Sequence, residues 1–504
     1  KNNTIEYLKQ FKNNLSIFKN IYNFDINKYY IIKNNIKNIN KKFDEIKKYI
    51  NNIDNILDNS IYGHRNAKKQ IKKIIGEWIN GDINGYSFGF EGPPGIGKTS
   101  LANEGITKCL IDENNNTRPF SLIAVGGSSN GSTFQGHNYT YVGSTWGKIV
   151  DILIESKCMN PIIFIDELDK ISNSENGKEI IGILTHLIDS TQNSKYQDKY
   201  FSGIDLDMSK TLFIFSYNDP SKIDKILLDR IHRIKFKPLT LNEKIVISND
   251  YIIPKILKGI GLENAITFNK NIIKFIISHY TLEPGVRKLK QIYSDIIREI
   301  NIEILNNENN FNNYPIVLNK KQITNKYLKN TQENIYTKIH SENSIAIING
   351  LWANSMGNGG IISIQGSWFF SQTFLDFKLT GMQGDVMKES MEVAKTLSFK
   401  LSKKNNKTIF KQFENKLQGI HIHCSDAATP KDGPSAGAAI TTVIYSLLNK
   451  LKIKKNIAIT GEININGDIT MIGGLALKIT GGIRAGVTHF FFPKENEKDY
   501  NKYC

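Results

Sequence analysis

The stretch GPPGIGKTS, Gly92 to Ser100, decides how the first half of this 504-residue chain is expected to fold. It matches the pattern G-x-x-x-x-G-K-[ST], whose glycines let backbone N–H groups turn inward around phosphates. A strand-like segment, YSFGF (86–90), precedes it, and a helical segment, SLANEGITKCL (100–110), follows it. This order predicts a nucleotide-binding loop at the end of a buried strand. The residues expected to contact the nucleotide are Gly92, Pro93, Pro94, Gly95, Ile96, Gly97, Lys98, Thr99 and Ser100.

Working outward, apolar segments alternate with helical stretches as far as residue 240. Short buried strands that alternate with helices are typical of a parallel α/β sheet. Beyond residue 240 the apolar residues recur at helical spacing, until an Asn-rich polar stretch begins near residue 306. The pattern predicts a helical N-terminal segment at 1–60, an α/β nucleotide-binding domain at 61–240, a helical domain at 241–305, a linker at 306–340 and an α+β domain at 341–504.

Two strands of the predicted sheet end in polar residues that suit phosphate chemistry. PIIFIDELDK ends a strand in Asp166 and Glu167, and TLFIFSYND ends the next strand in Asn218. After a phosphate-binding loop, we expect Asp166 to hold Mg²⁺ through water, with the Thr99 hydroxyl as a second ligand. Glu167 would polarise the attacking water, and Asn218 would orient it. The alternatives are a helix cap for the acids and turn chemistry for the asparagine.

Three arginines lie where they could reach phosphate oxygens. Arg230, in LLDRIHRIKF, comes just before a strand, where an arginine can reach the γ-phosphate bound by a neighbouring subunit; Arg233 is its rival. Arg287 is expected in the first turn of a helix that follows Pro284 and Gly285. The helix dipole disfavours a cation there, so either an outside anion or plain solvation accounts for it.

Composition narrows the classes of partner. The net charge of +17 suggests nucleic acid, but lysine is spread along the whole chain, so that partner is possible and unsupported. No apolar run reaches the roughly 18 residues that a membrane helix needs, so we expect no membrane partner. The four cysteines lack C-x-x-C spacing, which argues against a zinc site. Their scatter favours a reducing intracellular compartment, the cytoplasm or the mitochondrial matrix.

A second candidate site centres on Ser435, in the stretch TPKDGPSAG (429–437). The alternating segment GIHIHC before it predicts a strand and the apolar segment after it a helix, so Ser435 is either an N-cap or a nucleophile. His421 and His423 would share one face of that strand. No further residue nearby completes a Ser-His-Asp triad, and the G-x-S-x-G elbow is absent.

A Ser-Lys dyad needs only a lysine whose amine is kept neutral. Lys478 starts a predicted helix after Gly473 and Gly474, and its neighbours in LALKI are apolar. A lysine on a surface helix usually has polar company, and burial would lower its pKa. These residues leave two interpretations open: a catalytic dyad with Ser435, or an ordinary N-cap serine and a snorkelling lysine.

The motifs resemble those of the Lon family of ATP-dependent serine proteases over roughly residues 50–495. ATPKDGPSAG, TGEI (460–463) and GGLALK (473–478) are similar in order and spacing to the family's proteolytic domain, and GDVMKESMEVAKTL (384–397) is similar to the helix before its active site. IYGHRNAKKQI, TYVGS, LLDRI and PGVRKLK resemble its AAA+ ATPase half. The stretch 125–148 is similar to Lon-like proteins of giant viruses.

The resemblance implies an AAA+ P-loop domain with a helical lid, followed by an α+β Lon-type protease domain. It implies ATP and Mg²⁺ as cofactors, and a homohexameric ring that degrades unfolded or damaged proteins. Ser435 would be the nucleophile, Lys478 the general base, and Thr460 would orient the lysine amine. Tyr141 and Val142 would grip polypeptide in the pore of the ring; the alternative is that they anchor their glycine-rich loop in a core.

The chain departs from the family pattern in three places. Only some 60 helical residues precede the ATPase region, the sequence stops at DYNKYC where relatives carry a further strand-helix region, and GGLALK replaces the typical GGLKEK. The apolar Leu477 should favour a neutral Lys478. Two rivals stay open: an AAA+ remodelling ATPase or chaperone with an inactive protease domain, and an ATP-dependent nucleic-acid-binding factor.

Overall fold

The structure is a computed structural model that describes residues 26–79, 85–111, 116–126, 130–306, 315–334, 336–354, 357–373, 376–405, 418–425 and 432–503. The chain divides into two compact units. The first comprises Lys1–Glu91 with Lys98–Lys235, and the second comprises Gly92–Gly97 with Phe236–Cys504.

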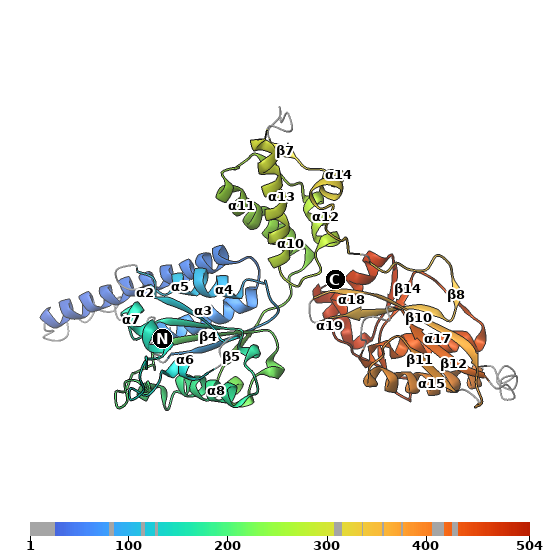
Figure 1. Cartoon of the computed structure of the whole chain (residues 1–504), viewed down its shortest axis with the longest axis horizontal. Helices are drawn as coiled ribbons and strands as arrows, with labels where there is room; N and C mark the ends of the chain where they lie inside the picture. The colour runs from blue at the N-terminus through green and yellow to red at the C-terminus, as the bar shows by residue number, and fades with distance from the viewer. Residues whose placement is uncertain are drawn as a thin grey trace. The chain divides into compact units, whose positions relative to one another are not determined.

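The first unit is built on a parallel sheet, as the alternating apolar segments predict (Figure 1). Its strand order is β2-β3-β4-β1-β5, and each neighbouring pair is parallel. The central strands β3 and β4 are buried almost throughout because helices cover both faces. The strands are β1 (Ser87–Glu91), β2 (Phe120–Ala124), β3 (Ile162–Asp166), β4 (Leu212–Tyr217) and β5 (His232–Lys235).

Helices of the first unit follow the strands in the expected alternation. One continuous helical stretch follows the phosphate-loop motif as α4 (Lys98–Ser100), the π-helical turn η1 (Leu101–Ile106) and α5 (Thr107–Cys109). Apolar residues of α7 and α8 share one hydrophobic core with β3 and β4. The remaining bounds are α2 (Ile26–Ser60), α3 (Arg65–Ile79), α6 (Ser132–Gln135), α7 (Lys148–Ser156), η2 (Leu168–Lys170), α8 (Glu175–Ile188), η3 (Asn193–Lys195), η4 (Pro220–Lys222) and α9 (Lys225–Asp229).

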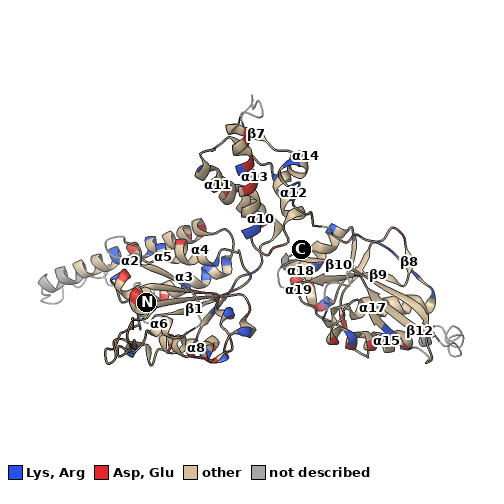
Figure 2. Ribbon diagram, viewed as in Figure 1, with Lys and Arg blue, Asp and Glu red and all other residues tan. Residues whose placement is uncertain are grey.

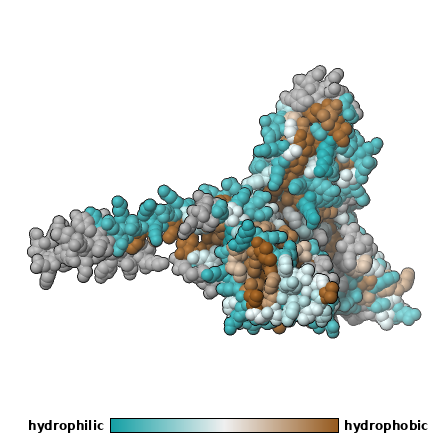
Figure 3. Space-filling view, turned by 60° about the vertical axis from the view of Figure 1, so that its left-hand side comes forward, coloured by the Kyte–Doolittle hydropathy of each residue, from teal (hydrophilic) through white to brown (hydrophobic). Residues whose placement is uncertain are grey.

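The long helix α2 agrees with the predicted N-terminal helical segment, of which residues 1–25 lie outside the described part. Its C-terminal half is anchored in the unit, since Ile53 and Leu57 are buried. Its earlier turns expose Ile39, Phe43 and Ile46 at helical spacing, and Figure 3 shows apolar atoms among polar ones along this helix.

The second unit contains a helical lid with its own core. Its helices are α10 (Leu241–Ile247), η5 (Ser248–Ile252), α11 (Ile253–Ile260), α12 (Lys270–Tyr280) and α13 (Arg287–Leu305). The predicted linker 306–340 differs from this structure in its middle, because Ile316, Leu318 and Ile323 are buried in the lid core. That segment forms β7 (Ile316–Val317), parallel to β6 (Ile266–Thr267), and then α14 (Lys320–Gln322) and η6 (Ile323–Tyr327).

The C-terminal part of the second unit is α+β, as predicted. Its main sheet has the order β11-β12-β10-β9-β14-β17 and mixes antiparallel with parallel pairs. The strands are β9 (Ile347–Ala353), β10 (Gly359–Phe370), β11 (Phe377–Thr380), β12 (Gln418–Cys424), β14 (Ile457–Ile459) and β17 (His489–Phe491). Short pairs are β8 (Ser344–Ile345) with β13 (Lys452–Ile453), and β15 (Glu462–Ile463) with β16 (Ile469–Thr470).

Helices cover both faces of this mixed sheet. α15 (Asp385–Asn405) and α17 (Gly437–Asn449) share a core with one face of β9, β10 and β12. α18 (Leu475–Ala485) packs on β9 and β10 and buries the opposite face, which includes Leu351 and Ile361. The chain then forms η8 (Lys494–Asn496) and α19 (Glu497–Tyr503). The residues that carry chemistry come from the ends of these helices.

Charge and hydropathy of the described surface reveal no dominant block. In Figure 2 basic and acidic residues are interspersed along the ribbon of both units, which agrees with the dispersed lysines of the sequence. None of the helices in the described part combines the length and apolar character that crossing a bilayer requires.

The N-terminus of α13 generates a stability prediction. The Glu283 carboxylate accepts hydrogen bonds from Lys288 N (2.9 Å) and Leu289 N (2.7 Å), which would otherwise be orphan donors of the first helical turn. We expect Glu283→Ala to lower the free energy of unfolding by about 1 kcal/mol, as the loss of a helix cap does. Urea unfolding measures it, with the exposed lid residue Glu263 as control: Glu263→Ala should change little, and equal effects would contradict the capping role.

Candidate functional site

The second unit brings Ser435, Thr460 and Lys478 together. Lys478 Nζ donates to Ser435 Oγ at 2.9 Å and to Thr460 Oγ1 at 3.2 Å. Thr460 is 1% exposed and Lys478 is 4% exposed, while Ser435 is half-buried. A lysine amine held between two hydroxyls, one of them accessible, has the geometry of a serine nucleophile with its base.

Ser435 is not a helix cap. It lies in the short 3-10 turn η7 (Pro434–Ala436), and the cap position of α17 is Ala436, which makes no side-chain cap. The N-cap interpretation is therefore wrong. The Ser435 carbonyl accepts Gly461 N at 2.8 Å and Thr460 Oγ1 at 3.2 Å, so the backbone of the serine is tied to the strand connection that also supplies Thr460.

Burial lowers the pKa of Lys478 to about 8. The lysine lies one turn into α18, where Leu475 and Ile479 are also buried. The helix touches β10 at a point where only glycine fits, because a Cβ on Gly359 would come within 2.0 Å of the Leu477 carbonyl oxygen. Close packing of helix on sheet thus excludes water from the amine, and the charged form is disfavoured.

The two histidines of β12 take no part in this contact. His421 Nε2 and His423 Nδ1 lie 2.8 Å and 2.9 Å from Thr380 Oγ1, so they share one face of the strand as predicted. Burial and the nearby charges of Lys378 and His423 lower the pKa of His421. Both histidines form hydrogen bonds with Thr380 on β11, and the described side chain that contacts Ser435 Oγ is Lys478. The triad alternative therefore has no geometric support.

Asp432, to which the sequence pattern assigned no role, holds the turn that precedes Ser435. Its carboxylate Oδ1 accepts Met387 N at 3.1 Å and Gly433 N at 3.0 Å, which ties the turn before Ser435 to the start of α15. Ser390 Oγ, one helical turn later, donates to the Pro434 carbonyl at 3.3 Å. An aspartate directly before Gly-Pro is a sequence signal for such a turn.

Lys98 of the phosphate-loop motif lies within the first unit. Its amine donates to the Tyr217 carbonyl at 3.0 Å and to Asn218 Oδ1 at 2.9 Å, at the end of β4. The predicted residues Lys98 and Asn218 are therefore brought together. Burial lowers the pKa of Lys98 to about 8, although the charges of Asp166 and Asp169 act in the opposite direction.

Asp169 was not among the predicted site residues, but it lies beside the contact between Lys98 and Asn218. It is 7% exposed, and its Oδ2 accepts Asn218 N at 3.2 Å and Asp219 N at 3.1 Å. Its Oδ1 is buried without a hydrogen-bond partner in the described part of the chain. The motif DELDK contains it, but only the fold places it under the end of β4.

Asp166 and Glu167 follow β3 as predicted. Asp166 is half-buried and its Oδ1 accepts Glu167 N at 2.9 Å. Glu167 is exposed and has φ +60° and ψ +41°, a left-handed conformation that strains a non-glycine residue by about 1 kcal/mol or more. Gly126, after β2, leaves room for its carboxylate, since a Cβ there would lie 2.3 Å from Glu167 Oε2. Thr99 is exposed, as is Ser100.

The segment Gly92–Gly97 belongs to the second unit and contacts the start of α13. Gly92, Gly95 and Gly97 have φ values of +156°, +77° and +97°, which side chains rarely adopt. The Gly95 carbonyl accepts Val286 N at 3.0 Å. Arg287, the first residue of α13, is exposed, and its Cβ would lie 3.2 Å from a Cβ built on Gly95.

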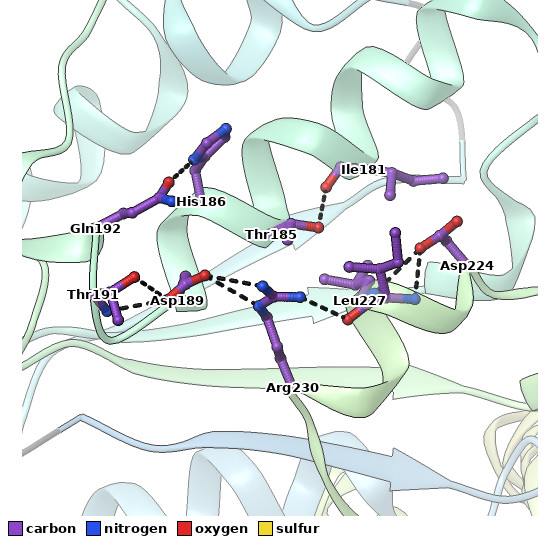
Figure 4. A network of polar contacts seen from close by, with 10 residues as sticks. Ile181, Thr185, His186, Asp189, Thr191, Gln192, Asp224, Leu227 and Arg230 are labelled. Carbon is purple, nitrogen blue, oxygen red and sulfur yellow. Dashed lines mark hydrogen bonds and ion pairs between the residues drawn. The ribbon is translucent and has the colours of Figure 1, made fainter.

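The two candidate arginines of the first unit are held by carboxylates. Arg230 donates through Nε (3.2 Å) and Nη2 (3.0 Å) to Asp189 Oδ2, and Nη1 donates to the Ile226 carbonyl, as Figure 4 shows. Arg233 donates through Nε (2.9 Å) and Nη2 (2.6 Å) to Glu91, directly before the phosphate loop. The Asp189 side chain is itself fixed by Thr191, whose contacts lower its pKa.

Tyr141 and Val142 lie at an exposed loop tip. Tyr141 is 66% exposed and Val142 is fully exposed. The alternative that they anchor their loop in a core is therefore wrong. An aromatic and an aliphatic side chain displayed to solvent are available to contact another chain.

Comparison with known proteins identifies the families whose models match. The model "ATPase family associated with various cellular activities" matches residues 88–239, that of the Lon protease AAA+ ATPase lid domain matches 258–313, and that of the Lon protease (S16) C-terminal proteolytic domain matches 318–503. The first model implies that this part of the chain binds a nucleotide.

Curated relatives extend this similarity over most of the chain. A Lon protease homolog of Acanthamoeba polyphaga mimivirus is 35% identical over 540 residues, 95% of this chain and 51% of that protein. The Lon protease of Campylobacter concisus is 36% identical over 84% of this chain and 52% of its own length, and that of Clostridium acetobutylicum is 34% identical over 89% and 55%. The chain spans about half the length of the curated relatives it matches.

The buried amine of Lys478 generates a prediction about pH. Only the neutral amine can accept a proton, and with a pKa of about 8 the neutral fraction grows as the pH rises from about 7 to about 9. We expect the rate at which a serine-reactive phosphonate labels Ser435 to rise over that range and then level off. Lys478→Arg, which stays charged, should remove the rise. A flat profile in the unaltered protein would contradict the assignment.

Proposed function

Because this chain belongs to the Lon family of AAA+ proteases, we propose that it is an ATP-dependent serine endopeptidase that unfolds, translocates and degrades protein substrates. The observation that carries the proposal is the 2.9 Å contact between the buried Lys478 amine and Ser435 Oγ. A remodelling ATPase with an inactive protease domain would have no need to keep this amine desolvated beside a serine.

The proposed cleavage starts at the dyad. Neutral Lys478 takes the proton of the Ser435 hydroxyl as Oγ attacks the substrate carbonyl carbon, and backbone N–H groups near Ser435 stabilise the oxyanion. The lysine ammonium then gives the proton to the leaving amine, and an acyl-enzyme remains. Water, deprotonated by the same lysine, attacks the ester carbonyl and frees Ser435. Thr460 orients the amine throughout through its hydroxyl.

The residues of the phosphate-loop motif fit a nucleotide. Glycines at positive φ turn backbone N–H groups toward a bound anion. The Lys98 amine already donates to two oxygen atoms, and a phosphate oxygen would be a further acceptor for it. Thr99 and Asp166 supply the hydroxyl and carboxylate oxygens that Mg²⁺ prefers. When bound, Mg²⁺ would neutralise charge that develops on the phosphates. Glu167 would polarise the attacking water, and Asn218, whose Oδ1 accepts a hydrogen bond from Lys98, would orient that water.

Assembly as a homohexameric ring completes the proposal. Arg230 lies on the surface, where it can reach the nucleotide of an adjacent subunit, and Arg287 begins the lid helix beside Gly95. Tyr141 and Val142 would grip unfolded polypeptide in the pore. The proposed domains are a helical segment at 1–60, the large ATPase domain at 61–240, the lid at 241–305, a segment at 306–340 whose middle packs into the lid core, and the protease domain at 341–504.

Cleavage of unfolded casein tests the proposal as a whole. We expect purified protein to degrade casein with Mg-ATP and to degrade little without it, and we expect Ser435→Ala to abolish cleavage while ATP hydrolysis persists. The readout is acid-soluble peptide, measured beside phosphate release. ATP hydrolysis without cleavage in either protein would favour the remodelling ATPase. ATP-dependent binding of nucleic acid that weakens steeply with salt would favour an ATP-dependent nucleic-acid-binding factor.

Arginine substitutions separate the two candidates for the trans contact. Arg230→Ala should lower the turnover of ATP by about a thousandfold, because a trans arginine acts on transition-state charge, and nucleotide binding should remain. Arg233→Ala is the matched control, because each of the two variants breaks one ion pair within the chain, Arg230 with Asp189 and Arg233 with Glu91. Loss of turnover in the control alone would exchange the two roles, and loss of binding in the Arg230 variant would refute its role.

A further inference from the structure

A buried carboxylate outside the sites described above lies at the base of the loop 137–145, here called the Tyr141 loop. Asp198 is 1% exposed, and its side chain accepts Gly147 N at 2.9 Å and Tyr200 N at 2.9 Å. Within the described ranges no lysine or arginine forms an ion pair with it. A buried carboxylate without a cation depends on such N–H groups for its stability.

The two ends of the Tyr141 loop are closely packed against each other. His137 N donates to the Thr145 carbonyl at 3.1 Å and closes the loop. Gly136 has φ +71°, and a Cβ there would lie 2.8 Å from Asp198 Oδ1 and 2.8 Å from the Thr145 carbonyl oxygen. The Asp198 carboxylate therefore lies between Gly136, before the loop, and Gly147, after it.

A second loop, residues 197–205, shares the same carboxylate; we call it the hairpin loop. It begins and ends at an antiparallel bridge between Tyr196 and Leu206. Asp198 is its second residue, and Ile204, near its end, is 55% exposed. The Asp198 side chain thus joins the backbone of the hairpin loop to Gly147, which follows the Tyr141 loop by two residues.

Aromatic contacts cover this junction on its solvent side. The Trp146 ring lies 6.0 Å from Phe201 in a stacked arrangement and 5.8 Å from Tyr200 edge to face. Trp146 follows the Tyr141 loop directly and its Nε1 donates to Asp151 Oδ1 at 2.5 Å. Polar and aromatic contacts thus join the same two segments.

We propose that Asp198 is a positioning residue for polypeptide pulling: it locks the Tyr141 loop to the hairpin loop, so that both move as one body. Tyr141 and Val142 on one loop and Ile204 on the other are exposed, so each loop offers apolar side chains to an extended polypeptide. The inference rests on the pulling role proposed above for Tyr141. A loop that is not locked at its stem would yield under load, and ATP hydrolysis would be uncoupled from movement of the substrate.

The substitution Asp198→Asn tests this coupling. The amide can accept only one of the two N–H groups well and presents its own donor to the other, and a hydrogen bond to a charged acceptor is lost. We expect the number of ATP molecules hydrolysed per folded substrate molecule degraded to rise roughly threefold or more, while cleavage of a small unfolded peptide and ATP turnover stay within about twofold. The matched control is Asp205→Asn, whose carboxylate accepts Gln197 Nε2 on the surface of the hairpin loop, and we expect it to behave like the unaltered protein.

A double variant separates coupling from general damage. In a Tyr141→Ala background, Asp198→Asn should add little to the loss of folded-substrate degradation, because both act on one step. An unchanged ATP-to-substrate ratio, or an equal loss of peptide cleavage, would overturn the inference. If Asp198→Asn does not fold, Trp146→Leu loosens the same junction, and an unchanged ratio in it would overturn the inference equally.

The same measurements show whether the coupling role of Asp198, the pulling role of Tyr141 or the proposed function itself is wrong. If the unaltered protein degrades folded substrates with ATP but Tyr141→Ala does so equally well, the pulling role is wrong and the inference falls with it. If no ATP-dependent degradation occurs in the unaltered protein, the proposed function itself is wrong.

Discussion

The burial of one lysine amine is the constraint on which the protease half of this chain depends. Among the residues that the structure describes, Lys478 has two hydroxyl partners and no carboxylate partner, so desolvation lowers its pKa unopposed. Keeping water out requires α18 to lie directly on the sheet, and Gly359 and Gly481 provide that approach because a Cβ on either would come within about 2.2 Å of backbone atoms. Packing of helix on strand is therefore part of the chemistry.

The partner serine is positioned by backbone contacts. The Ser435 carbonyl accepts hydrogen bonds from Gly461 and Thr460, and Asp432 ties the turn before Ser435 to the start of α15. Thr460 takes part in both networks, since its hydroxyl donates to the serine carbonyl and accepts from the lysine amine. Thr460 Oγ1 is therefore the atom at which η7, the connection after β14 and α18 meet. A shift in any of these elements would lengthen the contact between Lys478 and Ser435.

The order of domains and the parallel sheet could be predicted because each has a local signature in buried apolar runs and a glycine-rich turn. A lysine among apolar neighbours left the dyad open beside an N-cap serine and a snorkelling lysine, and the resemblance to the Lon family favoured the dyad. The structured middle of the segment 306–340 could not, because a two-residue strand and a single helical turn have no measurable period. Nor could Asp169 and Asp198 be singled out. Both carboxylates are buried beneath backbone N–H groups only in the folded chain, and the N–H groups that bind Asp169 are about 50 residues away in the sequence.

Two of the buried lysines, Lys98 and Lys478, show how one physical effect would serve the two proposed kinds of chemistry. Burial lowers the pKa of Lys98 and of Lys478 to about 8. Around Lys98 the carboxylates Asp166 and Asp169 oppose that shift, and an arriving phosphate would add further negative charge, so ligand binding favours the ammonium. In the described part of the chain the Lys478 amine donates hydrogen bonds to two hydroxyls, and a neutral peptide substrate would bring no charge. The amine therefore stays able to accept a proton, which is what a base for Ser435 requires.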